Sequence, residues 1–148
     1  DYVKKLDGSY VKKAQNKFEF AEQLREDIRE FRAKNNLDRL VMIWCGSTEI
    51  FIEPSTVHKT KESFIQGMKE NHPDIAPSML YAWAAIAEGV PYANGAPNLS
   101  ADFPAMHEFA DEMGVHPSWI TYIFKEKPIT QAERIGKVLG IEPRDLIK

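Results

Sequence analysis

Apolar residues in the first quarter of the chain recur at helical spacing. Between residues 17 and 36 they are separated by four, four and three positions, with charged side chains between them: Phe20, Leu24, Ile28 and Phe31. This pattern predicts an amphipathic helix with these four residues facing inward, ending at Asn35. Residues 1–16 are polar and basic without an apolar stripe, which predicts an extended lead-in.

Two short apolar runs predict strands. The first is LVMIWC, residues 40–45, which Gly46 closes. A continuous run of this kind is typical of a strand buried on both faces in a parallel sheet. The second lies within VPYANGAPN, residues 90–98, and enters a turn rich in Gly, Pro and Asn. Two strands make a poor sheet, so we expect that part of this domain is missing or supplied by another chain.

Two helices are predicted between these strands. Over residues 59–71 the inward positions are Phe64, Ile65 and Met68. A deeply covered helix is predicted between Pro77 and Gly89, because SMLYAWAAIAE is apolar almost all round. The order of helices and strands predicts an α/β layer fold, as a partial Rossmann-like segment over residues 1–103.

Short helices alone are predicted after residue 104. MHEFADEM ends at Gly114, and Pro117 opens SWITYIF. Thr130 and Glu133 form a capping box for QAERIGKVL. Residues 104–148 are therefore predicted to form a small all-helical unit.

Charge and cysteine content narrow the possible functions. A net charge of −3 and a pI near 5.8 give no global attraction to nucleic acid or anionic lipid. The single cysteine, Cys45, excludes an internal disulfide and fits a reducing compartment. The longest apolar runs are too short to span a bilayer. We therefore expect a cytoplasmic protein with no membrane partner.

The four histidines show no spacing typical of metal ligands, so no metal site is predicted. We expect them to be surface or capping residues: His58, His72, His107 and His116.

Several blocks carry a resemblance that covers residues 1 to about 115. They are YVKKLDGSYVKKAQNK, EDIREF, DRLVMIWCGSTEIF, APSMLYAWAAIAEGVPYANGAPN and ADFPAMHEFADEMGV. In these blocks the chain closely resembles inositol-3-phosphate synthase, the NAD-dependent enzyme that cyclises glucose 6-phosphate. The resemblance implies NAD as cofactor and a crevice at the carboxyl ends of the strands, where open α/β sheets bind ligands.

The resemblance also implies which residues line that crevice. From WCGSTE they are Cys45, Gly46, Ser47, Thr48 and Glu49, and from NGAPN they are Asn94, Gly95, Ala96 and Asn98. Other roles stay open for some of them. Cys45 is also explained as a small buried apolar residue at a strand end. Ser47, Thr48 and Asn94 are also explained as side chains that satisfy loop backbone groups.

Two parts of the family pattern are absent from this sequence. No glycine-rich G-x-G-x-x-G turn for a pyrophosphate occurs anywhere in it. The family's lysine-rich block, similar to GKDFKTGQT, is expected soon after Val115, where this chain has HPSWITYIF. Lysines of that kind stabilise developing negative charge on oxygen. We therefore expect catalysis by this chain to be incomplete, and we assign no catalytic residue.

Residues from about 106 to 148 resemble the repressor-type helix-turn-helix family. Ala110 is the small residue where two helices touch, Gly114 makes the turn, and Val115, Ile120 and Ile123 pack the second helix. The resemblance implies contacts to duplex DNA through residues 116–127, from Ser118, Thr121, Tyr122, Lys125 and Lys127. Acidic residues slightly outnumber basic ones in 104–148, however, which disfavours phosphate binding. A helical appendage used for packing or dimerisation is the alternative.

The octet EFADEMGV, residues 108–115, fits both families, because both use a short helix that ends at a left-handed glycine. Our hypothesis is a chimera or designed fusion with its junction in this octet. A scaffold with neither activity is a third possibility. An apolar face left over by the partial sheet would favour self-association into a homo-oligomer.

Overall fold

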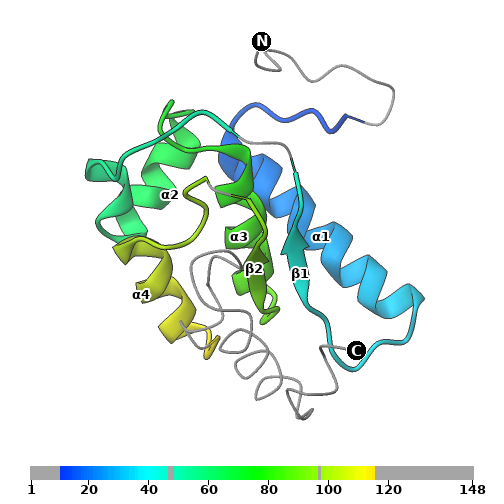
Figure 1. Cartoon of the computed structure of the whole chain (residues 1–148). Coiled ribbons are helices and arrows are strands. Elements are labelled where there is room, and N and C mark those ends of the chain that lie inside the picture. The colour runs from blue at the N-terminus through cyan, green and yellow to red at the C-terminus, as the bar shows by residue number, and fades with distance from the viewer. Residues whose placement is uncertain (1–10, 47–48, 97, 116–148) are drawn as a thin grey trace.

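The computed structural model describes residues 11–46, 49–96 and 98–115 (Figure 1). Its elements in chain order are α1 (Lys17–Lys34), β1 (Met42–Trp44), the 3-10 helix η1 (Thr56–His58), α2 (Lys61–Lys69), α3 (Pro77–Ala87), β2 (Tyr92–Asn94) and α4 (Pro104–Glu112). The predicted α/β class is confirmed for this part of the chain. β1 and β2 pair in parallel, with Met42 opposite Tyr92 and Trp44 opposite Asn94.

The predicted helices begin and end close to the expected residues. The Asn16 side chain caps α1 by accepting a hydrogen bond from the backbone N–H of Glu19 at 2.9 Å. Asn36, just past its end, has a left-handed φ of 51°. α3 has Pro77 at its first turn, and Gly89 follows it with φ 66°. Local capping chemistry therefore fixes these boundaries.

α3 is the centre of the hydrophobic core. It packs against α1, both strands and α4, which is why its sequence is apolar on every side. Phe64 of α2 is fully buried beside Trp83 of α3, with ring centroids 5.7 Å apart. Trp83 in turn stacks on Phe109 of α4 at 3.9 Å. Aromatic contacts thus join three helices in one core.

α4 belongs to this core. Its Met106 and Ala110 are fully buried, and Val115 just beyond it is 5% exposed. Gly114 has the left-handed φ of 67° that the sequence predicted for the helix end. The helix predicted to be shared between two units therefore packs on the α/β part. The remainder of the predicted helical unit, residues 116–148, lies outside the described residues.

Two predictions of buried apolar residues were wrong. β1 was expected to be buried on both faces, but Val41 and Ile43 are 45% and 58% exposed. Met42 and Trp44 pack against the core, because the described helices cover only that face of the strand. On α1, Phe31 was expected to face inward and is 56% exposed, since no described residue covers it. The spacing of apolar residues predicted which side of α1 is apolar, but not how far along the helix other residues cover that side.

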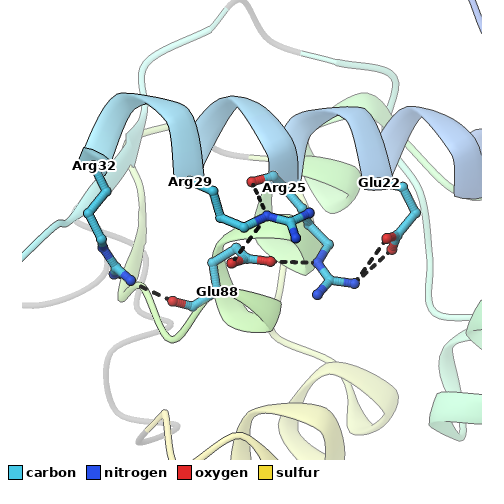
Figure 2. Close-up of polar contacts among 5 residues, drawn as sticks. All are labelled: Glu22, Arg25, Arg29, Arg32 and Glu88. Atoms are coloured by element: carbon cyan, nitrogen blue, oxygen red, sulfur yellow. Dashed lines mark hydrogen bonds and ion pairs between the residues drawn. The ribbon is translucent and has the colours of Figure 1, made fainter. Parts of the chain in front are cut away.

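An ionic network fixes α1 to the carboxyl end of α3 (Figure 2). The Arg25 guanidinium binds the Glu88 carboxylate at 2.7 Å and Glu22 at 2.9 Å. Arg29 lies 3.7 Å from Glu88, and Arg32 donates to the Glu88 carbonyl oxygen at 3.5 Å. Cationic groups at a helix carboxyl end also interact favourably with the helix dipole. These contacts set how α1 lies along α3.

Among the described helices, none is both long and apolar enough to cross a membrane.

Candidate functional site

The two segments of the predicted crevice meet at the carboxyl edge of the sheet. Because β1 and β2 are parallel, the loops after them leave from the same edge. The backbone N–H of Gly95 donates to the Trp44 carbonyl oxygen at 2.8 Å. A Cβ atom on Gly95 would lie 2.9 Å from that oxygen and 3.8 Å from the Cys45 sulfur. The close approach of the two loops therefore requires a glycine here.

The predicted residues differ in exposure. Cys45 and Gly46 are exposed, Glu49 and Gly95 are half-buried, and Asn94, Ala96 and Asn98 are buried. The alternative explanation of Cys45 as a buried residue is wrong, because the chain has already left the strand at this position. Ser47 and Thr48 lie outside the described residues.

Asn94 organises the turn after β2. Its side-chain amide donates to the Asn98 carbonyl oxygen at 2.7 Å, and its side-chain oxygen accepts from the backbone N–H of Ala96 at 2.9 Å. Both contacts are with loop backbone groups, which agrees with the alternative explanation that Asn94 satisfies the backbone of the loop. Asn94 therefore gives the loop its shape.

Glu49 connects the loop after β1 to the first turn of α3. Its carboxylate accepts from the Ser78 backbone N–H at 2.8 Å and also from the Ser78 hydroxyl. The residue that precedes α3, Ala76, has no side chain able to cap the helix. Glu49 supplies the missing cap across 29 residues of sequence, with a negative charge that complements the helix amino end.

A buried polar cluster extends from this cap. The Asn98 side-chain amide donates to Glu49 at 2.8 Å, and the Ser100 hydroxyl donates to the Ser78 oxygen at 2.9 Å. Ser78 and Ser100 are fully buried. The sequence reasoning missed both serines. A serine inside the otherwise apolar SMLYAWAAIA run was the available signal, since a buried hydroxyl needs a partner.

Two buried polar atoms of the crevice have no hydrogen-bond partner among the described residues. They are the side-chain oxygen of Asn98 and the indole nitrogen of Trp44. The Trp44 ring lies against Tyr81 of α3, with centroids 5.1 Å apart. Buried polar groups normally have partners, so each of these atoms has unused hydrogen-bonding capacity.

His58 is a capping residue, as predicted, but it is not on the surface. It is 1% exposed, and its Nδ1 accepts from the Ser55 backbone N–H at 2.9 Å. Its Nε2 lies 3.1 Å from the Asp74 carbonyl oxygen, so Nε2 carries the proton. Burial lowers the pKa of His58 below its usual value. In the described ranges, no group of three or more His, Cys, Asp or Glu residues is placed to hold a metal ion.

The residues predicted to contact DNA lie outside the described ranges: Ser118, Thr121, Tyr122, Lys125 and Lys127.

Comparison with known proteins identifies relatives of the chain. The family model for myo-inositol-1-phosphate synthase matches residues 1–121, which extends past the octet 108–115. Inositol-3-phosphate synthase 1 of Bacteroides thetaiotaomicron is 47% identical over 116 residues, covering 78% of this chain and 27% of the relative. Inositol-3-phosphate synthase of Trypanosoma brucei brucei is 49% identical over 88 residues, covering 59% of this chain and 17% of the relative.

The fold is also shared with a solved structure. The crystal structure of inositol-3-phosphate synthase from Caenorhabditis elegans superposes with a TM-score of 0.66 and 29% sequence identity, covering 72% of this chain and 21% of that one. The chain thus spans about a quarter or less of the length of these relatives. The predicted resemblance to inositol-3-phosphate synthase is confirmed for the amino-terminal segment, which resembles the NAD-binding region of that enzyme. Since the family model matches most of its residues, the chain belongs to the myo-inositol-1-phosphate synthase family.

Proposed function

We propose that the loops at residues 45–49 and 94–98 form part of the NAD-binding crevice of an inositol-3-phosphate synthase. The observation that carries the proposal is the meeting of both loops at the carboxyl edge of two parallel strands. Open α/β sheets bind ligands at this edge. The family match covers both loops and supports NAD as the ligand.

The conversion of glucose 6-phosphate needs more than these loops. The sequence has no G-x-G-x-x-G turn to cradle a pyrophosphate, and it lacks the lysine-rich block expected after Val115. We propose that this chain contributes cofactor contacts and leaves phosphate binding and charge stabilisation to residues that it does not contain. It is therefore expected to bind NAD without turning over substrate.

Titration with NAD tests this function. Trp44 ends β1 directly before the first crevice loop, whereas Trp83 is stacked on Phe109 in the core, so the fluorescence of Trp44 is the expected reporter. We expect a saturable change that persists in Trp83→Phe and disappears in Trp44→Phe. A wild-type titration without saturation, or one unaffected by loss of Trp44, would contradict the assignment.

A variant of the turn extends this test. Asn94→Ala removes both side-chain contacts that shape the loop and is expected to weaken NAD binding. Glu30→Gln, an exposed change on α1, is the matched control and is expected to leave binding unchanged. Equal affinities for the two variants would argue against a role for the turn.

DNA binding through residues 116–127 stays a prediction. We expect any such binding to appear as a salt-dependent shift of duplex DNA that Lys125→Ala weakens. Absence of binding at low salt would remove it. Self-association also stays a prediction, motivated by the exposed apolar side chains before, within and after β1: Val41, Ile43, Ile50 and Phe51. A strictly monomeric species in sedimentation would count against it.

A further inference from the structure

The amino end of α3 lies at the candidate crevice. Glu49 from the loop after β1 and Asn98 from the loop after β2 both contact Ser78 in its first turn. An amino-terminal helix end carries unpaired backbone N–H groups and a partial positive charge, so it ordinarily attracts anions such as phosphate. What occupies this end of α3 therefore decides which chemical group a ligand can place there.

Glu49 occupies the position that an anion would take at this helix end, beside the Ser78 N–H. Its carboxylate takes the Ser78 backbone N–H, Pro77 has no N–H, and the Met79 N–H is already bonded to the Ala76 carbonyl oxygen at 3.1 Å. The negative charge of Glu49 also repels a second anion placed beside it. The Ser78 and Met79 N–H groups are thus bonded within the protein, and the Glu49 charge already complements the helix dipole.

The hydrogen-bond donors of the surrounding cluster are bonded to other members of the cluster. The Ser100 hydroxyl donates to Ser78, the Ser78 hydroxyl donates to Glu49, and the Asn98 amide donates to Glu49 at 2.8 Å. The remaining free group is an acceptor: the side-chain oxygen of Asn98, a residue only 5% exposed, has no partner among the described residues. A ligand group that completes this cluster has to be a hydrogen-bond donor.

We propose that Glu49 is a specificity-determining residue, which makes this end of the crevice accept an uncharged hydrogen-bond donor and exclude phosphate. The donor is a carboxamide or a hydroxyl group. The inference rests on the proposed function in taking NAD as the ligand. It places an uncharged part of the dinucleotide, rather than the pyrophosphate, against α3.

Phosphate titration of the whole chain tests the exclusion. The probe is inorganic phosphate, and the readout is the ¹H–¹⁵N chemical shift of the Ser78 amide. In the wild type this amide is expected not to move. In Glu49→Ala, which removes the charge and the oxygens that occupy the Ser78 N–H, phosphate is expected to shift it saturably. Glu53→Ala, the same substitution at an exposed position of the same loop, is expected to behave as wild type.

Two results would overturn the exclusion. One is a saturable shift of the Ser78 amide by phosphate in the wild type. The other is a folded Glu49→Ala protein, verified by circular dichroism, that gains no phosphate binding. If that variant does not fold, Glu49→Ser, which also removes the charge and the carboxylate, is expected to gain phosphate binding instead. Failure of this second variant to gain it also overturns the exclusion.

Nicotinamide and sorbitol, as uncharged carboxamide and hydroxyl donors, test the acceptor. One of the two compounds is expected to change the chemical shift of the Asn98 side-chain amide in the wild type. The compound that does so identifies the donor as a carboxamide or a hydroxyl group. A shift by neither overturns the assignment of the acceptor. These outcomes are separate from those of the proposed function, which fails if NAD itself shows no saturable binding.

Discussion

Gly95→Ala tests the meeting of the two crevice loops. The new Cβ would lie 2.9 Å from the Trp44 carbonyl oxygen, a distance that real Cβ atoms essentially never show. The clashing atom belongs to the backbone, so it cannot be relieved by rotating a side chain. Restoring an ordinary contact requires the loops to separate by about 0.5 Å, which also lengthens the 2.8 Å hydrogen bond between them.

The expected loss of stability follows from these two effects. Overpacking of this kind costs about 1–3 kcal/mol, and a weakened backbone hydrogen bond costs up to about 1 kcal/mol. We therefore expect the free energy of unfolding, measured by urea denaturation, to fall by about 2–3 kcal/mol. NAD affinity is expected to fall as well, because the loops no longer lie in register.

Gly89→Ala is the matched control for this change. Gly89 has a left-handed φ of 66°, but a Cβ there would meet no atom within 4 Å. It is expected to cost only about 1 kcal/mol, from backbone conformation alone, and to leave NAD affinity unchanged. A Gly95→Ala protein within about 0.5 kcal/mol of the wild type, or one less affected than Gly89→Ala, would refute the close approach of the loops.

Three further changes are expected to have defined effects. Burial lowers the folded-state pKa of His58, so its contribution to stability is complete above about pH 6.5 and is lost as the pH falls through the folded pKa. Urea denaturation across this pH range should show the loss. A His58→Gln protein with the same pH dependence would contradict it. Glu88→Gln leaves the half-buried Arg25 without its closest charged partner and should lower the free energy of unfolding by about 1–2 kcal/mol. The exposed control Glu30→Gln should leave it almost unchanged. Equal losses in the two variants would mean that the α1–α3 network contributes no stability. Phe64→Ala removes a fully buried ring and should lower the free energy of unfolding by about 3–5 kcal/mol, and a loss under about 1 kcal/mol would show that the core is not packed as described.

The sequence predicted the elements well where local chemistry decides them. Pro77 and Gly89 bracket α3, and Gly114 ends α4, because the conformational preferences of these residues act on their own backbone. The predicted strands were also found, although each is only three residues long. Their parallel pairing followed from the α/β order and brought the two crevice loops together.

Contacts between distant segments were not predictable from local pattern. Nothing near Glu49 indicates that it caps a helix 29 residues later, and nothing near Ser100 indicates its bond to Ser78. The same limit explains why Ile43 was expected to be buried and is exposed. An apolar run shows that a face prefers to be covered, but what covers it depends on other parts of the polypeptide.

NAD titration monitored at every assigned backbone amide is the most direct measurement of the central claim, that both loops form one cofactor-binding crevice. We expect saturable shifts with a single dissociation constant in residues 45–49 and 94–98 together, and none in the middle of α1. Shifts that saturate in only one loop, that concentrate elsewhere, or that never saturate would contradict it.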